Sequence, residues 1–278
     1  MALKTDLLAY YKMEEASGNL ADATGNGYTA TQQDNPTYQQ TGKIDYGISF
    51  DGINDYFLIQ EAGALDLFGG ASGASVSVWV NITESAGRKL VFHDTWSGTS
   101  TRVRVEIDAD EKISVGARDT SGATQRVKLT DSAVATGSFI HIVAVIDIAN
   151  DDIIIYVDGS PVASSGTTTF TETSFAADAS MNTNLAALGD GTNQFKGTLD
   201  EMAIWSRVIS QTEVTEIYNS GNGLSYDDWD VGEEGTNTQI NIGDDWKVVD
   251  AMKINISDDW KAVAGAQINI GDAWKTIF

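Results

Sequence analysis

Two acidic residues on a predicted strand have the spacing of a pair that could hydrolyse a glycosidic bond. Residues 106–111 read Glu-Ile-Asp-Ala-Asp-Glu, and the side chains of Glu106 and Asp108 share one face of an extended strand. Two carboxyl groups that flank a sugar linkage can act as nucleophile and general acid. However, Asp110 and Glu111 have the composition of a turn, and no dense aromatic cluster accompanies the segment to line sugar subsites. We therefore expect no catalytic residue here and no enzymatic activity.

An oxygen-rich loop is the first candidate cation site. Residues 22–27 read Asp-Ala-Thr-Gly-Asn-Gly, and Ca²⁺ takes carboxylate and carbonyl oxygens of the kind that Asp22 and Asn26 offer. The same residues also suit an Asx-type turn in which both glycines adopt positive φ. Both interpretations remain open at this point.

Trp96 is the strongest candidate for contact with carbohydrate. It lies among small polar residues in the segment 93–100, unlike the tryptophans of the alternating strands. An exposed indole stacks on the C–H face of a sugar, and neighbouring hydroxyl groups orient that sugar. A tryptophan packed beneath its own loop is the alternative.

Charge and composition exclude several classes of function. The 278 residues contain 17 Lys and Arg against 40 Asp and Glu, a net charge of −23, which repels nucleic acid. The chain has no cysteine and only two histidines, His93 and His141, so thiolate chemistry and His-rich metal sites are excluded. No apolar run is long enough to span a membrane and the start lacks a signal-peptide block, so we expect neither membrane insertion nor signal-dependent export.

Short alternating segments predict an all-β, antiparallel sandwich. Each is rich in Val, Ile, Phe or Tyr and is bounded by Gly, Asn, Asp or Ser. Residues 75–80 alternate small polar with large apolar side chains, and we expect the apolar set, with Trp79, to face the core. The predicted strands are 48–50, 56–59, 75–82, 89–92, 102–107, 112–117, 125–129, 139–147, 153–157 and 199–204.

Local signals place the turns and one helix. Residues 108–111 and the pair Asp158-Gly159 are predicted turns between strands. Ser210 and Glu213 have the spacing of a capping box, which marks the start of a short helix. One short helix does not change the fold class.

The end of the chain repeats itself three times. An acidic, glycine-bearing linker over 227–238 separates a first domain, 1–226, from a module over 239–278. In that module the pattern Ile-Asn-Ile-(Gly/Ser)-Asp-x-Trp-Lys recurs every 14 residues without a gap. We expect each copy to form strand, turn and strand. Isolated hairpins bury too little surface to be stable, so the module either packs within the chain or assembles with other chains.

Several motifs, in order along the chain, resemble laminin-G-like, concanavalin A-like jelly-roll domains. They span about residues 5 to 226, and they imply two curved antiparallel sheets with ligand-binding loops at the rim. The carboxyl-terminal repeat also resembles terminal segments of bacteriophage structural proteins. The motifs are YYKME at 10–14, DATGNG at 22–27, ISFDGINDY at 48–56, YVDG at 156–159 and GTLDEMAIW at 197–205.

The resemblance also implies positions for ligand and cation sites. It places the loop of Asp22 and Asn26 near the strand that carries Asp200, which adds Asp200 to the candidate Ca²⁺ ligands. Pentraxins, which are similar in fold, bind calcium through two rim loops. By strand order these correspond to residues 93–100 and 189–194, so ligand-binding residues are expected among Asp94, Trp96, Thr99, Asp190 and Asn193.

The hypothesis drawn from these resemblances is a non-enzymatic surface protein of a phage virion. Its jelly roll is expected to bind a host cell-surface glycan, while its repeats form a homo-oligomer, a trimer being favoured, or attach to other virion proteins. One competing hypothesis is a purely structural decoration or fibre protein without a specific ligand. A second is a glycoside hydrolase acting through Glu106 and Glu111, and a third is a bacterial adhesin.

Overall fold

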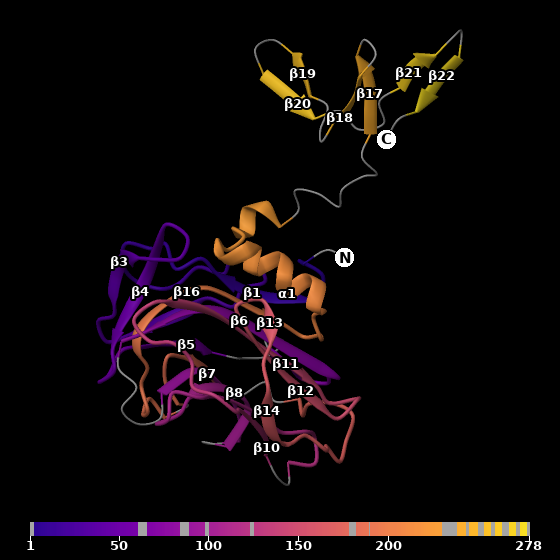
Figure 1. Ribbon diagram of the computed structural model, residues 1–278. Helices are drawn as coiled ribbons and strands as arrows, with labels where there is room; N and C mark the ends of the chain where they lie inside the picture. Colours follow the sequence, from indigo (N-terminus) through magenta and orange to yellow (C-terminus); the bar gives the residue numbers. More distant parts are fainter. Residues whose placement is uncertain are drawn as a thin grey trace. The chain divides into compact units, whose positions relative to one another are not determined.

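Two antiparallel eight-stranded sheets pack face to face in the computed structural model (Figure 1). Their inner faces together supply one hydrophobic core, as expected for an antiparallel jelly-roll sandwich. Sheet A has the order β13-β12-β11-β6-β16-β4-β3, with β1 paired to β16. Its strands are β1 Leu7–Tyr11, β3 Thr37–Thr41, β4 Tyr46–Asp51, β6 Gly73–Ile82, β11 Phe139–Asp147, β12 Asp152–Val157, β13 Ser160–Pro161 and β16 Lys196–Trp205.

Sheet B has the order β14-β10-β9-β8-β7-β15-β5-β2. Its strands are β2 Ala30–Gln33, β5 Tyr56–Gln60, β7 Lys89–Ser97, β8 Ser100–Ile107, β9 Ile113–Ala117, β10 Arg126–Thr130, β14 Ser164–Thr167 and β15 Asn182–Leu185. The prediction of an all-β sandwich is therefore confirmed.

The structure describes most of the chain. It covers residues 3–60, 66–83, 89–97, 100–122, 125–177, 182–188 and 190–229, together with six strands between 238 and 276. For residues 96, 97, 100 and those six strands, only the backbone is described. The described residues divide into two compact units, one within 3–228 and the other from 229 onward.

Strand β6 shows how the sequence pattern builds the core, and it corrects one expectation. Val76, Val78 and Val80 belong to the core between the sheets. Trp79 lies opposite His141 on β11, and it therefore shares a face with Ser75 and Ser77. That face is turned away from the core, so the expectation that Trp79 points inward is wrong. Trp79 is nevertheless buried, because Tyr218 of the helix stacks on it with ring centroids 5.7 Å apart.

The predicted helix and turns are present. Helix α1, Gln211–Tyr218, begins at Ser210, whose hydroxyl accepts from the Glu213 N–H while the Glu213 carboxylate accepts from the Ser210 N–H. Two short 3₁₀ helices follow, η1 Asn219–Gly221 and η2 Tyr226–Asp228. Figure 1 shows α1 against sheet A, beside β1 and β13. No helix of the described residues is long and apolar enough to cross a membrane.

The described strands of the second unit form three antiparallel pairs with one repeated register. Asn241 lies opposite Trp246, and the equivalent asparagine and tryptophan face each other in both later copies. Each repeat therefore contains two antiparallel paired strands, whereas the predicted turns at 243–244, 257–258 and 271–272 lie outside the described residues. The strands are β17 Thr238–Ile242, β18 Asp245–Val249, β19 Lys253–Ile256, β20 Asp259–Ala262, β21 Gln267–Ile270 and β22 Ala273–Thr276.

Candidate carbohydrate and cation sites

A row of residues crosses the face of sheet B that is turned away from the core. Asn184 of β15, His93 of β7, Arg104 of β8 and Gly116 of β9 lie opposite one another in successive strands. Their strand neighbours point into the core, so this set points outward. With the half-buried residues at either end we call it the outer row: Leu58, Asn184, His93, Arg104, Gly116 and Val127.

The outer row contains amide, imidazole and guanidinium groups, of which Asn184 and His93 are buried and Arg104 is half-buried. Asn184 donates from Nδ2 to the Leu188 carbonyl at 2.6 Å, while its Oδ1 is buried without a partner in the described chain. The His93 ring nitrogen Nε2 lies 2.9 Å from Thr101 Oγ1. Arg104 pairs with Glu106 at 3.3 Å. These are groups that hydrogen-bond sugar hydroxyls.

Gly116 leaves room for two polar side chains above the sheet. A Cβ at this position would lie 2.7 Å from Gln125 Nε2 and 2.8 Å from Arg104 Nε. The amide and the guanidinium therefore converge over the glycine, where any larger residue would displace them. Gln125 Nε2 is also buried without a hydrogen-bond partner in the described chain, and an unsatisfied buried donor is costly.

The loop that carries Asp190 and Asn193 lies at the edge of this face, and both residues are exposed. Asp190 Oδ1 accepts from the Thr192 hydroxyl at 2.6 Å and from the Thr192 N–H at 3.0 Å. These bonds, and the nearby charge of His93, hold the pKa of Asp190 below its usual range. The Asn193 carbonyl accepts from the Leu90 N–H on β7. The loop therefore adds an exposed carboxylate beside His93.

Asp94 does not lie in a rim loop, and its assignment as an exposed ligand is corrected. It belongs to β7 and is fully buried. Its carboxylate accepts from Arg102 Nε and Nη2 at 2.5 and 3.0 Å and from the Thr183 hydroxyl at 2.9 Å. Arg102 also binds Asp66 at 2.6 Å. This buried ion cluster joins three segments of chain and leaves Asp94 no contact with solvent.

The other two predicted ligand residues of this segment are Trp96 and Thr99. Trp96 lies in strand β7 rather than in a loop, and its side chain lies outside the described residues. Thr99 lies outside them altogether. Their role as ligand-binding residues therefore stays a prediction.

The acidic segment 106–111 does not form a pair of carboxylates on one strand. Strand β8 ends at Ile107, and residues 108–111 form the predicted turn. Asp108 Oδ1 accepts from the N–H groups of Asp110 and Lys112, each at 2.9 Å. Asp108 thus holds the turn, and Glu106 pairs with Arg104 on the outer face of β8.

Three carboxylates gather on the outer side of sheet A. Glu14, Asp200 and Glu201 each have an oxygen within 4.8 Å of the other two. Asp200 Oδ2 accepts from the N–H groups of Lys43 and Ile44 at 2.7 and 3.0 Å. Its Oδ1 is buried without a partner in the described chain. This set of hard oxygen donors fits Ca²⁺.

Burial makes these carboxylates hard to ionise in the absence of a cation. Burial raises the pKa of Asp200 to about 8. Burial, with the charge of Asp227, raises the pKa of Glu201 to about 8, and burial also raises that of Glu14. A bound cation would reverse this preference, because an opposite charge favours the ionised form.

The loop of Asp22 is not part of this carboxylate group. Asp22 accepts five hydrogen bonds, among them those from the N–H groups of Tyr10, Gly27 and Tyr28. Asn26 donates from Nδ2 to the carbonyls of Leu7 and Leu8, each at 3.0 Å. The loop therefore has the geometry of an Asx-type turn, and of the three predicted cation ligands only Asp200 lies in the carboxylate group.

Sequence reasoning did not find Glu14, Glu201, Arg104, Asn184 or Gln125. Glu201 follows Asp200 directly and adopts φ 50° at an irregularity in β16, which has no signature in the sequence. The pairing of Arg104 with Gly116 depends on strand register, and Gln125 precedes a strand instead of lying in one. Strand alternation in β8 would by itself have placed the Arg104 side chain on the other face of the sheet from Val103 and Val105, which point into the core.

The comparisons with known proteins agree with this fold. The family model described as the concanavalin A-like lectin/glucanases superfamily matches residues 51–215. No curated protein matches the sequence. Among solved structures, the binding domain of Paraclostridial Mosquitocidal Protein 1 aligns with TM-score 0.60 and 16% identity, over 79% of this chain and 53% of that one.

Two further solved structures contain carbohydrate. The ligand-binding domain of botulinum neurotoxin serotype D, in complex with N-acetylneuraminic acid, aligns with TM-score 0.57 and 12% identity, over 77% of this chain and 50% of that one. Domain 4 of the extracellular arabinanase AbnA of Geobacillus stearothermophilus, in complex with arabinotriose, aligns with TM-score 0.55 and 19% identity, over 76% and 97%. This chain thus spans about half the length of the toxin domains, and at these identities the likeness establishes the fold.

Proposed function

This chain belongs to the concanavalin A-like lectin/glucanase superfamily, and from that premise we propose that its first unit is a non-enzymatic carbohydrate-binding domain. The proposed ligand is a glycan on the surface of a host cell. The proposed binding surface is the outer row on sheet B with the loop of Asp190 and Asn193 at its edge, and Trp96 and Thr99 remain proposed contacts at the end of β7.

The outer row carries this proposal. Side chains of different hydrogen-bonding character lie in register across four strands. A sugar chain running across the strands would meet Arg104, which is partly exposed, whereas Asn184 and His93 are buried and would have to become exposed before contact. Asn184 Oδ1 and Gln125 Nε2 are buried without partners in the described chain. Because such groups are costly, a small side-chain rotation that brings them to glycan hydroxyl groups is favoured. Similar domains with bound sialic acid and arabinotriose support the same ligand class.

A glycan array probed with the full chain tests the proposal. We expect a restricted set of glycans to bind and Asn184→Ala to weaken that binding about fivefold, the effect of one lost hydrogen bond of about 1 kcal/mol. Asn150→Ala, in the exposed turn that joins β11 to β12, is the matched control. An array that stays blank for a folded protein, or equal loss for both variants, would contradict the proposal and favour a purely structural role.

The absence of hydrolysis is part of the proposal. Of the acidic residues that motivated a hydrolase, Asp108 holds a turn and Glu106 pairs with Arg104. A pair of carboxyl groups that acts on a glycosidic bond must keep one nucleophile or base and one acid free on either side of it. The proposed lack of hydrolysis would be overturned if the protein released reducing sugar from β-glucans and the Glu106→Gln variant did not.

Ca²⁺ is proposed as a structural cofactor, held by Glu14, Asp200 and Glu201. Its positive charge would balance the negative charges of the three neighbouring carboxylates. These residues then connect β16 with the segment before β2 and, through the N–H groups of Lys43 and Ile44, with the turn before β4. The two faces of the sandwich would thus have separate roles, cation binding on one and glycan binding on the other.

The repeats are proposed to assemble the protein or attach it to a phage virion, which makes its surface the proposed location. Their support is the repetition of one register in three hairpins and the instability of isolated two-stranded hairpins. Several weak glycan sites on one oligomer bind more tightly through avidity. Light scattering on the full chain and on a chain ending at Tyr226 tests this, with a trimer and a monomer expected. Two monomers would favour docking on another virion protein.

A further inference from the structure

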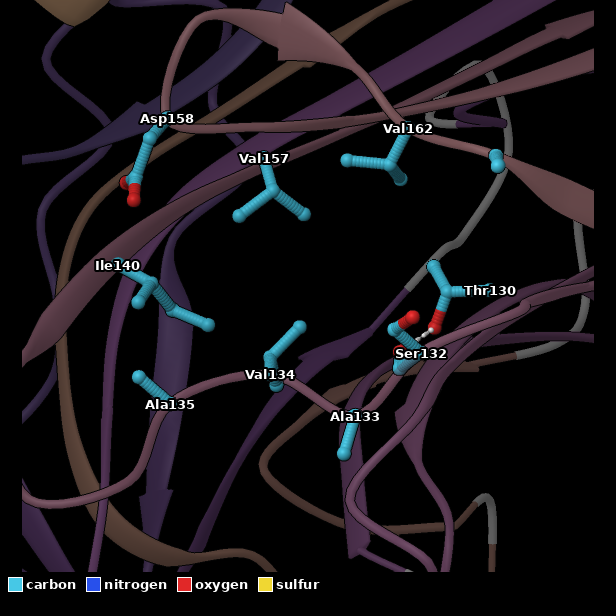
Figure 2. A pocket seen from close by; sticks show the side chains of 10 residues that line it. Thr130, Ser132, Ala133, Val134, Ala135, Ile140, Val157, Asp158 and Val162 are labelled. Atoms are coloured by element: carbon cyan, nitrogen blue, oxygen red, sulfur yellow. Dashed lines mark hydrogen bonds between the residues drawn. The ribbon is translucent and has the colours of Figure 1, made fainter.

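An apolar pocket opens between the two sheets at one edge of the sandwich (Figure 2). Its volume is about 400 Å³, within the range that holds a small ligand or a buried side chain. It lies where β12 of sheet A and the β10–β14 pair of sheet B end, and its lining residue Thr130 is on the same strand as Val127, the last residue of the outer row. The lining residues are Thr130, Ser132, Ala133, Val134, Ala135, Ile140, Val157, Asp158, Val162 and Ala163.

The wall of the pocket is mainly aliphatic, and Ser132 and Asp158 are its polar side chains besides Thr130. The N–H groups of Val134, Val162 and Asp158 are already donated to backbone carbonyls at 2.8–2.9 Å, and the Ala163 carbonyl accepts from Asp131. Thr130 Oγ1 donates to the Ser132 carbonyl and accepts from the Ile113 N–H. In Figure 2 the side chains of Val134, Val157 and Val162 point toward the hollow. An aliphatic group is therefore the occupant that this wall fits.

The charges at the mouth have one sign. Asp158 lines the pocket and Asp131 adjoins it, and both are exposed. None of the lining residues is Lys or Arg, and the whole chain carries a net charge of −23. Charge complementarity thus selects a basic group beside the aliphatic one and disfavours a carboxylate such as that of a fatty acid.

An unprotected strand edge adjoins the pocket. Strand β14 begins at Ser164, directly after the lining residue Ala163, and it is the last strand of sheet B in the described chain. Among the described strands it pairs only with β10, so its other edge presents backbone N–H and C=O groups to solvent. Its residues are Ser-Ser-Gly-Thr, without the charge or proline that usually blocks such an edge.

We propose that this edge of the sandwich binds an extended peptide segment of a partner protein, which pairs with β14 and inserts a branched aliphatic side chain into the pocket. A basic residue beside that side chain would face Asp158 and Asp131. In strand addition the backbone bonds supply affinity and the pocket supplies specificity. The site adjoins the Val127 end of the outer row, because Val127 lies opposite Thr167 of β14, but Asn184, His93 and Arg104 lie on other strands of sheet B.

The test uses the full chain and a synthetic six-residue peptide that alternates valine and lysine, with binding followed by fluorescence anisotropy of a labelled terminus. Replacing the valines with serine is expected to weaken binding at least tenfold. Two further peptides carry N-methyl groups on alternate backbone nitrogens, one on the odd and one on the even positions. One of the two is expected to bind at least tenfold more weakly, because its methylated amides are those that would donate to β14. Replacing the lysines with glutamate is expected to abolish binding.

Variants of the protein locate the site. Ala133→Phe fills the pocket from an exposed position and is expected to weaken the valine–lysine peptide at least fivefold. Ala149→Phe, at an exposed position in the turn between β11 and β12, is the matched control and is expected to leave binding unchanged. The proposal would be overturned if the serine peptide bound as tightly as the valine peptide, or if neither N-methylation nor Ala133→Phe changed the affinity. Binding of n-octylammonium in place of the peptide would also overturn it.

Discussion

On sheet A the face turned away from the core lies beneath helix α1, whereas the equivalent face of sheet B has no helix against it in the described part of the chain. The two faces therefore use aromatic and polar residues differently. On sheet A, Trp79, His141 and Tyr218 form a continuous stack with centroid separations of 4.8 to 6.0 Å. On sheet B, the outer row includes the Oδ1 of Asn184, which has no partner among the described residues.

This difference shows how one fold can separate stability from recognition. In the stack on sheet A, His141 Nε2 lies 2.8 Å from Ser77 Oγ. Its Nδ1 is buried without a partner in the described chain but lies in a ring packed against Trp79 and Tyr218. In the outer row, the buried Oδ1 of Asn184 has no partner among the described residues, which costs stability but leaves an acceptor that a ligand could use. Changes on sheet A should thus alter the free energy of unfolding, and changes on sheet B should alter binding.

Removal of the indole from the stack should have the largest effect. Trp79→Ala is expected to lower the free energy of unfolding by about 3–5 kcal/mol, the usual cost of truncating a buried aromatic side chain. Val127→Ala, at the half-buried end of the outer row, should cost less than about 1.5 kcal/mol. Urea denaturation followed by far-UV circular dichroism measures both. Comparable losses would remove the distinction between the two faces.

The carboxylate group on sheet A should confer a calcium response. Ca²⁺ at one hundred times its Kd should stabilise the fold by about 2.7 kcal/mol, seen as a rise in melting temperature that chelator reverses. Asp200→Asn should abolish the rise. It should alter the chelated protein little, because a carboxyl group with a pKa of about 8 is mostly protonated at pH 7.

Asp22→Asn is the control for the calcium response. It weakens a carboxylate that holds its own loop, so it should lower the melting temperature but leave the rise with Ca²⁺ intact. The opposite pattern, in which Asp22→Asn removes the rise and Asp200→Asn does not, would move the cation site to the loop of Asp22.

Acid should weaken the stack on sheet A. Burial lowers the pKa of His141 to about 3 from 6.5, so the unfolded chain binds a proton more readily than the folded one. Stability contributed by the neutral imidazole is therefore complete above pH 6.5 and is lost as the pH falls toward 3. At pH 5 the loss is about 2 kcal/mol, since each pKa unit corresponds to about 1.4 kcal/mol.

Denaturation in urea between pH 7 and 5 measures this slope. His141→Gln should flatten it, whereas Ser77→Ala should keep it, because the cause is burial of the imidazole. Imidazole NMR signals in the unaltered protein give a second measurement. A His141 resonance that titrates near pH 6.5 in the folded state would refute the assignment.

The smallest effect on stability is expected on sheet B, at Arg104. Arg104→Gln keeps a polar group over Gly116 and should change the free energy of unfolding by less than about 1 kcal/mol, because its partner Glu106 can be reached by the amide. Glycan affinity should fall about tenfold, measured by titration calorimetry with the best ligand of the array. Arg118→Gln, which alters a side chain that donates to the carbonyls of Thr101 and Gly122, provides the comparison.

Features set by neighbours in the sequence were the most predictable from it. The capping box of Ser210 and Glu213, the turns at residues 108–111 and at Asp158-Gly159, and the paired strands in each repeat depend on contacts within a few residues, and all are present. Trp79 shows the limit of such reasoning. The prediction grouped Trp79 with the core-facing valines because it is apolar, although strict alternation puts it on the other face from Val78, and alternation does not tell which face of a strand the helix will cover.

The cation and glycan surfaces depended on contacts between distant segments. Glu14 and Asp200 are separated by 186 residues (200 minus 14) and meet because β1 pairs with β16. Asp94 has the sequence context of an exposed ligand, but Arg102 and Thr183 enclose it in the fold. No spacing rule connects such residues, because strand register and bulges bring them together.

The sequence by itself therefore determined the class of fold, the helix, the turns and the threefold repeat, since short-range periodicity and local hydrogen bonds specify these. The tertiary structure alone decided which carboxylates stand together, which aspartate is buried in an ion cluster, and which face of the sandwich the helix covers. The physical reason is that burial and register arise from the packing of strands far apart in the chain. The same side chain can be a ligand, a turn residue or part of a buried ion pair according to what packs against it.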